Sequence, residues 1–251
     1  MQYNKQLPKN WVLLRGLMRS QFHWKNFAEL LKIKLQLESV QSVELPGNGF
    51  LCHEKTPIDI FQVITQLRSQ LNVSGKQPIG IIGISLGGML ATQWAQLYPQ
   101  EVSHIVLINS SSSLSPFYKR LLPQNYPALI KNLILSRDAQ LEKFILSTTS
   151  NNRNKWESQA QENINFLMKF PLSGLNFFRQ LKLATQVDFS KKPEANKLIL
   201  ASKADRLVSY TCSERIAKLW NCDILYHETA GHDLPLDDAD WVIEKIRGSK
   251  Y

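Results

Sequence analysis

A serine flanked by glycines ends a run of apolar residues in the first half of the chain. Residues 83–88 read Gly-Ile-Ser-Leu-Gly-Gly, and no polar side chain separates Ile79 from Ile84. Serine is mostly exposed in folded proteins, and small residues on both sides of it indicate a sharp turn with close packing. Ser85 is therefore either a turn residue or a nucleophile held at the end of a strand.

The segment 83–87 matches the pattern G-x-S-x-G where this pattern is informative, between an apolar strand and an apolar helix. The chain turns so sharply there that the hydroxyl is lifted above the sheet, and a Cβ atom at either glycine would strike a neighbouring segment. The helix that follows begins with unpaired N–H groups, which suit an oxyanion. These features favour Ser85 as a nucleophile.

A nucleophilic serine needs a base, and the base needs an acid that orients it. Asp205 comes shortly after an apolar run that ends at Ser202, and His232 comes shortly after a run that ends near Glu228. The carboxyl ends of parallel strands meet at the edge where open α/β sheets bind ligands. We predict a triad of Ser85, Asp205 and His232. Three such groups in this order along the chain are a more specific sign of a catalytic triad than any one of them alone.

Other residues of the same types compete with this assignment. Asp205 could be an ordinary turn aspartate. His232 could belong to a surface loop, although Gly231 beside it indicates a tight turn that presents the ring. Asp188 and Asp223 are the competing acids, but neither follows a strand at the right point.

The remaining histidines and the last aspartates have more ordinary interpretations. We expect His104 and His227, within or near strands, to be satisfied structural histidines, whereas His23 and His53 could approach the site. Three aspartates near the end of the chain are expected to cap helix N-termini: Asp233, Asp237 and Asp238.

Apolar runs and the segments between them predict the framework that positions these groups. Strands are expected at 11–14, 40–45, 78–84, 102–110, 197–202 and 223–228. Helices are expected at 22–35, 57–71, 86–98, 212–220 and 238–247. The second of them starts at Pro57, which the first turn of a helix tolerates. Continuous apolar strands that alternate with helices are typical of an α/β fold, a parallel sheet covered on both faces.

The alternation stops between residues 110 and 193, where no buried strand is recognised. Helical patterns occur instead at 126–135, 138–149, 157–170 and 175–185. A structureless loop of this length is implausible in a compact domain, so the segment is interpreted as a helical insertion on the sheet. The predicted organisation is a core of residues 1–110 and 194–251 with a cap of residues 111–193.

Composition and charge exclude several classes of protein. The chain has 251 residues, of which 43% are hydrophobic and 20% charged, and no repeat or low-complexity tract is recognised. No signal peptide or membrane-spanning run is expected, and three widely spaced cysteines favour a reduced, cytoplasmic protein. The net charge of +9 is scattered along the chain, which disfavours nucleic-acid binding but leaves room for an acidic substrate or partner.

With these residues in place, the chain resembles the α/β-hydrolase superfamily, and within it the small cap-bearing carboxylesterases. The likeness extends from Trp11 to Arg247 and is carried by "LLRG", "ISLGGMLATQWAQLYP", "HIVLINSS", "ADRLV" and "GHDLPL". It implies that Ser85 attacks an acyl carbon, His232 relays the proton and Asp205 holds the imidazole in the correct tautomer. Apart from the resemblance, no metal-ligand cluster or phosphate-binding loop is recognised in the sequence, so no metal or other cofactor is predicted.

The chain departs from the superfamily in two places. The loop after the first strand usually reads His-Gly, whereas this chain has Arg15-Gly16-Leu17. The N–H groups of Leu17 and Leu86 can still form the oxyanion hole, because the donors are backbone atoms. Arg15 could alter the surroundings of the site, place a cation near the pocket or form a surface salt bridge. Only ten residues precede the first strand, so the usual first two antiparallel strands are expected to be missing.

The resemblance predicts an esterase acting on short-to-medium acyl chains, with a pocket roofed by the cap. Four residues are expected to line its acyl side: Leu17, Phe117, Phe144 and Thr148. The alternatives are a thioesterase or methyl ester esterase acting on an acyl carrier protein or coenzyme A, and a catalytically silent protein that binds a ligand or partner. An acidic carrier protein would suit the basic residues of the cap and its flanks: Lys119, Arg120, Lys131, Arg137, Lys143, Arg153, Lys155, Lys169, Arg179 and Lys182.

Overall fold

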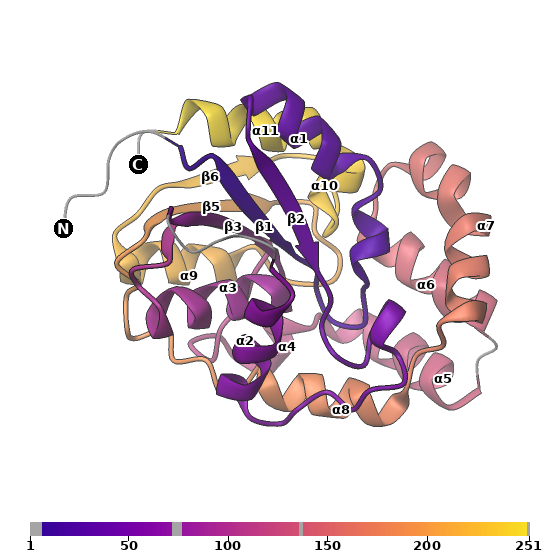
Figure 1. Cartoon of the computed structure of the whole chain (residues 1–251). Coiled ribbons are helices and arrows are strands. Elements are labelled where there is room, and N and C mark those ends of the chain that lie inside the picture. Colours follow the sequence, from indigo (N-terminus) through magenta and orange to yellow (C-terminus); the bar gives the residue numbers. More distant parts are fainter. Residues whose placement is uncertain (1–6, 72–76, 136–137, 250–251) are drawn as a thin grey trace.

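The computed structural model describes residues 7–71, 77–135 and 138–249, and its strands form a six-stranded sheet (Figure 1). The strands lie in the order β2-β1-β3-β4-β5-β6, and every neighbouring pair is parallel. Their bounds are β1 Asn10–Leu14, β2 Ser39–Val43, β3 Ile79–Ile84, β4 Val102–Ile108, β5 Asn196–Ser202 and β6 Ile224–His227. The predicted α/β class, with a mostly parallel sheet of about six strands, is confirmed.

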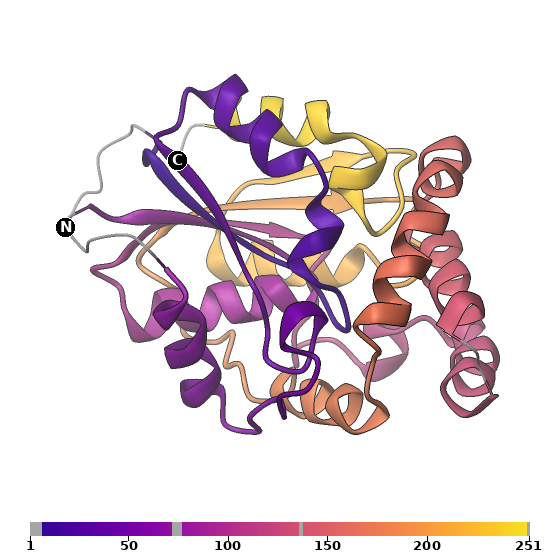
Figure 2. The ribbon, with the colours of Figure 1, turned by 45° about the vertical axis from the view of Figure 1, so that its right-hand side comes forward.

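Helices cover both faces of this sheet. Figures 1 and 2 show α1 and α11 on one face and α2, α3 and α9 on the other. One apolar core contains Trp94 and Trp220, and the other contains Trp11, Phe27 and Ile243. β3 and β4 are buried along their whole length between these cores, which explains their continuous apolar sequences. The helix bounds are α1 Phe27–Leu35, α2 Ile60–Ser69, α3 Leu86–Leu97, α9 Thr211–Trp220 and α11 Ala239–Gly248.

The helix predicted over 22–35 is interrupted near its start, so that prediction is wrong in part. A 3₁₀ helix, η1 (Gln21–Trp24), ends at Lys25, whose φ of 49° and ψ of −128° are not helical, and α1 begins at Phe27. The N–H of Ser20 donates to His23 Nδ1 at 3.0 Å in a capping box that closes this short turn. The local cap therefore ends a helix that apolar spacing alone would continue.

Asp59, and not Pro57, sets the start of the next helix. A second 3₁₀ turn, η2 (Gly49–Leu51), follows β2, and α2 then begins at Ile60. The Asp59 carboxylate accepts hydrogen bonds from Phe61 N–H at 2.7 Å and from the next N–H at 3.3 Å. Asp59 is the better start because its side chain satisfies backbone donors at the helix end.

Between β4 and β5 the described residues form helices and no strand. They are α4 Phe117–Arg120, η3 Pro123–Asn125, α5 Tyr126–Leu135, α6 Asp138–Thr149, α7 Arg153–Lys169 and α8 Gly174–Leu183. Figures 1 and 2 show α5 to α8 gathered at the end of the sheet towards which the strands point. α7 begins four residues earlier than expected, because Asn152 caps it by accepting from Lys155 N–H at 3.2 Å.

The helices of this protein are short. The longest one that the structure describes, α7, has 17 residues and carries charged and amide side chains along most of its length. In the described part of the chain, no helix is both long enough and apolar enough to cross a membrane.

Candidate active site

Ser85 lies at the turn between β3 and α3 in a strained conformation. Its φ is 53° and its ψ is −115°, values that a non-glycine residue rarely adopts. A Cβ atom on Gly83 would strike Gly87, and one on Gly87 would strike the backbone of Leu14 in β1. The N–H of Ser85 donates to Ile108 O at 2.9 Å, which ties the turn to β4. The glycines are therefore required by the close approach of neighbouring backbone, as expected.

Asp205 and His232 form a buried pair. Asp205 follows β5, and its Oδ2 lies 2.7 Å from His232 Nδ1, with 1% and 6% of the two side chains exposed. Oδ1 of Asp205 accepts from the N–H groups of Leu207 at 2.7 Å and Val208 at 3.0 Å, so the carboxylate is fixed at both oxygens. A neutral imidazole bonded in this way carries its proton on Nδ1 and its lone pair on Nε2.

The two residues that directly follow β4, Asn109 and Ser110, connect the loops that carry these groups. Asn109 donates through Nδ2 to His232 O at 2.8 Å and accepts from Ser202 N–H at 2.7 Å. Ser110 Oγ donates to Ser85 O at 3.1 Å. Two adjacent residues thus hold the Ser85 turn, the end of β5 and the His232 backbone together at one edge of the sheet. Asn109 is not among the predicted site residues, although its place directly after the buried strand β4 is a signal for such a role.

Among the residues that the structure describes, His232 Nδ1 is bonded to Asp205 and no hydrogen bond joins Ser85 Oγ to the imidazole. Such a bond often tightens only when substrate closes the site. The structure therefore shows the Asp205–His232 pair and the strained Ser85 turn, whereas a serine–histidine hydrogen bond stays a prediction.

The competing acids lie elsewhere. Asp188 is exposed and accepts from Ser190 N–H at 2.9 Å and Ser190 Oγ at 2.6 Å, and these hydrogen bonds lower the pKa of its carboxyl. Asp223 is exposed and directly precedes β6, so it lies at the opposite edge of the sheet from His232. Neither position places a carboxylate beside the imidazole.

Residues 15–20, called here the oxyanion loop because they include the predicted donor Leu17, lie against Ser85. A Cβ atom on Gly16 would be 3.3 Å from Ser85 Cβ and 3.9 Å from Ser85 Oγ. Among the described residues, the N–H groups of Leu17 and Leu86 donate to no other backbone or side-chain acceptor. Both N–H groups therefore remain available for the predicted oxyanion hole, one in this loop and one in the first turn of α3.

Arg15 forms a buried ion pair and not a surface salt bridge. Its Nη1 and Nη2 donate to the two carboxylate oxygens of Asp233 at 3.1 and 2.5 Å, and its guanidinium carbon lies 4.9 Å from the centre of the Trp24 ring. Burial is the largest single influence on the pKa of Asp233 and raises it, but the charge and hydrogen bonds of Arg15, together with smaller contributions that include the Arg19 charge, lower it by more, so the net direction is downward. The expectation that Asp233 caps a helix with its side chain is wrong, because α10 (Leu234–Asp237) leaves this carboxylate to Arg15.

Known proteins share this arrangement of strands and turns. Residues 45–239 match the family described as the alpha/beta hydrolase fold. The chain belongs to this family. It is 24% identical, over 86% of its length and 82% of the other protein, to a pimeloyl-[acyl-carrier protein] methyl ester esterase from Wigglesworthia glossinidia brevipalpis. The predicted resemblance to α/β hydrolases is thereby confirmed.

Solved structures agree with the family. An esterase from Exiguobacterium antarcticum has a TM-score of 0.71 at 18% identity, covering 96% of this chain and 91% of that one. A 2-hydroxy-6-oxo-6-phenylhexa-2,4-dienoate hydrolase from Rhodococcus sp. strain RHA1 has a TM-score of 0.72 at 17% identity, covering 98% and 92%. At these identities the structures show a shared fold.

A second buried ion pair joins α6 of this α/β hydrolase to the oxyanion loop. Arg19 Nη1 lies 2.9 and 2.7 Å from the two carboxylate oxygens of Glu142 on α6, and Asn163 of α7 donates to the same carboxylate at 3.0 Å. Only 9% of the Arg19 side chain and 1% of the Glu142 side chain are exposed. A buried charge that loses its partner is destabilising, so α6 and the oxyanion loop are tightly coupled.

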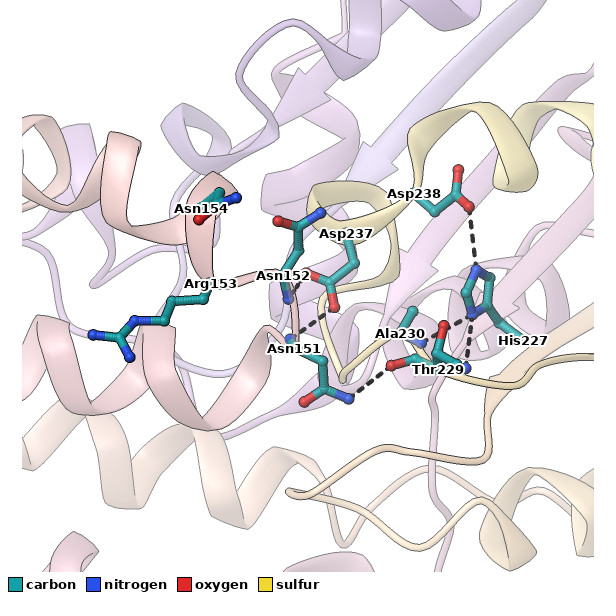
Figure 3. Close-up of a pocket in the computed structure, with 9 residues that line it drawn as sticks. All are labelled: Asn151, Asn152, Arg153, Asn154, His227, Thr229, Ala230, Asp237 and Asp238. Carbon is teal, nitrogen blue, oxygen red and sulfur yellow. Dashed lines mark hydrogen bonds and ion pairs between the residues drawn. The ribbon is translucent and has the colours of Figure 1, made fainter.

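The turn between α6 and α7 holds the loops of both Asp205 and His232. Asn151 Nδ2 donates to Ala204 O at 3.0 Å and to Thr229 O at 2.9 Å. Asp237 accepts from Asn151 N–H at 2.9 Å (Figure 3) and also from Gly231 N–H at 2.6 Å. The expectation that Asp237 caps a helix is wrong, because its carboxylate is buried against this turn.

Asp238 does cap α11, by accepting from Trp241 N–H at 3.0 Å, as expected. It also lines a surface pocket of about 450 Å³ whose wall includes Asn151, Asn152, His227 and Asp237 (Figure 3). Neither Ser85 nor the Asp205–His232 pair lines this pocket. It is therefore separate from the candidate active site.

Among the other histidines, His104 and His227 have the structural roles that their positions indicated. His104 is buried, with Nδ1 3.0 Å from the Ser103 hydroxyl, and burial lowers its pKa to about 4. His227 Nδ1 accepts from Ala230 N–H at 2.9 Å. His23 is part of the η1 capping box, where burial, followed by the charges of nearby arginines, lowers its pKa, and His53 is exposed.

The four predicted pocket residues are spread over the oxyanion loop, α4 and α6. Leu17 is half-buried in the loop, and Phe117, at the start of α4, is 60% exposed. Phe144 and Thr148 are half-buried and, four residues apart on α6, share one face of that helix. Contact of these side chains with a substrate stays a prediction.

Proposed function

We propose that this α/β hydrolase cleaves carboxylic esters of short-to-medium acyl chains through a Ser85–His232–Asp205 triad. The observation that carries the proposal is the buried Asp205–His232 pair at the sheet edge where Ser85 is held in the strained turn. The names of two similar proteins support ester hydrolysis as the reaction class: the Wigglesworthia protein is a methyl ester esterase and the Exiguobacterium protein is an esterase. Location in the cytoplasm is part of the proposal and rests on the free cysteines.

In the proposed reaction Ser85 Oγ attacks the ester carbon while His232 Nε2 takes the serine proton. The N–H groups of Leu17 and Leu86 stabilise the negative oxygen of the tetrahedral intermediate. His232 then gives the proton to the leaving alkoxide, and an acyl-serine ester remains. Water attacks this ester by the same route and releases the acid. Arg15 takes no direct part, because its charge is already paired with Asp233.

A fluorophosphonate probe tests this proposal. A serine activated by a base attacks phosphorus and displaces fluoride, so intact mass should rise by one phosphonyl group. The variants Ser85→Ala and His232→Ala should remain unlabelled, and Ser112→Ala, which removes another buried serine hydroxyl, should label like the wild type. Absence of label on the folded wild type would favour the alternative of a silent binding protein.

A second candidate has support of its own: an ester or thioester carried by an acidic acyl carrier protein. The relative from Wigglesworthia acts, by its name, on an ester linked to such a protein. Several predicted basic residues of the cap are exposed and could attract it: Lys131, Lys143, Arg153, Lys155, Lys169 and Lys182. Arg120 and Arg179 instead donate to the backbone carbonyls of Ala184 and Thr56, and Arg137 lies outside the described residues.

The salt dependence of kcat/KM distinguishes a carrier-bound substrate from a free ester. We expect kcat/KM for a carrier-bound acyl ester to fall about 10-fold or more between roughly 0.05 and 0.5 M salt, because screening removes electrostatic steering. The rate for the corresponding free methyl ester should change less than about 2-fold. Equal salt dependence of the two substrates, or no preference for the carrier, would leave a small-molecule esterase.

A further inference from the structure

A glutamine of the cap reaches the backbone of the oxyanion loop. Gln180 lies on α8, is fully buried, and its Oε1 accepts from Met18 N–H at 3.0 Å. Its Nε2 donates to Asn48 Oδ1 at 2.8 Å and to Thr56 Oγ1 at 3.3 Å. Every polar atom of this side chain is therefore engaged with the core.

The bond from Met18 holds a strained backbone. Met18 has a φ of 57°, in the left-handed region that a methionine rarely adopts. Such a conformation persists only where neighbouring groups determine it from several sides. Asn48, which Gln180 orients, donates through Nδ2 to Arg19 O at 3.1 Å, so the loop is fixed at two successive residues.

The residue before Met18 is Leu17, whose N–H is one of the two proposed oxyanion donors. We propose that Gln180 is a positioning residue that sets the place of the Leu17 N–H by holding the Met18 turn. This inference rests on the proposed serine-hydrolase function. Without Oε1 the Met18 N–H would be buried and unpaired, and the turn would relax to a more favourable φ. A shift of about 1 Å in such a donor can cost on the order of 10²-fold in rate.

The chain offers a matched control one helical turn earlier. Asn176 lies on the same helix and is 3% exposed, and its amide also binds core backbone, at Thr56 N–H (3.0 Å) and Glu54 O (3.0 Å). It bonds to the loop between β2 and α2 and not to the oxyanion loop. Loss of either amide should therefore weaken the docking of α8, but only loss of Gln180 should move the oxyanion donor.

The experiment compares Gln180→Met with Asn176→Leu on p-nitrophenyl butyrate. We expect kcat to fall about 10- to 100-fold in Gln180→Met with KM changed less than about 3-fold, because the donor acts in the transition state. The inhibition constant of a trifluoromethyl ketone, whose hemiketal oxygen binds the oxyanion hole, should rise in parallel. Asn176→Leu should change kcat less than about 3-fold. Equal losses in the two variants would overturn the inference, because they would indicate general damage to cap docking.

The variant Gln180→Glu provides a rescue. A buried carboxyl group tends to be neutral, and it then offers one acceptor to Met18 and one donor to Asn48. We expect it to recover most of the kcat that Gln180→Met loses, and a kcat as low as that of Gln180→Met would count against positioning. If Gln180→Met does not fold, Gln180→Asn, which is too short to reach Met18, takes its place. Failure of the wild type to react with the fluorophosphonate would instead refute the proposed function itself.

Discussion

Replacing either Ser85 or His232 with alanine is expected to lower kcat by about 10⁴- to 10⁶-fold on any ester that the wild type hydrolyses. The serine forms the acyl bond and the imidazole moves the proton, so neither step proceeds without the other. Because the two groups act as one unit, the double variant should be little slower than either single variant. Initial rates with a p-nitrophenyl ester give kcat for the two single variants and for the double variant.

Controls separate chemistry from folding in this experiment. Alanine at position 85 must adopt a φ of 53°, so the thermal unfolding of each variant has to be measured beside its activity. His53→Ala removes an exposed histidine and should keep the wild-type rate. Rate losses that add fully in the double variant would argue against a triad, and so would a Ser85→Ala variant that retains activity.

Asp205→Asn is expected to retain the fold and to lose about 10³- to 10⁴-fold in kcat. The amide oxygen can still accept from the N–H groups of Leu207 and Val208, which keeps the loop after β5 in place. An amide N–H facing His232 Nδ1 cannot accept its proton, so the ring is driven to the tautomer that protonates Nε2. That tautomer has no lone pair to receive the serine proton.

The same substitution at two other aspartates tests this assignment. Asp188→Asn and Asp223→Asn remove exposed carboxylates that lie before β5 and β6, and each should change kcat less than about 2-fold. A loss at either position as large as that of Asp205→Asn would show that Asp205 is not the orienting acid.

The sequence alone determined the framework and the candidate triad. β3 and β4 are buried on both faces, and burial on both faces requires continuous apolar residues, so a local pattern reveals them. The turn around Ser85 was equally readable, because only glycine tolerates the close backbone contacts at 83 and 87. Helix ends were less readable. The caps at Ser20 and Asp59 set helix ends at residues other than those that apolar spacing predicts.

Only the tertiary structure decided which polar groups support the site. Arg15 pairs with a carboxylate 218 residues away, and the Met18 N–H meets an amide 162 residues away. Asp233 and Asp237 resembled helix caps in sequence, but one pairs with Arg15 and the other binds the turn between α6 and α7. Such partners leave no periodic trace in the sequence, because a buried polar group is satisfied by whatever donor or acceptor the fold brings within about 3 Å.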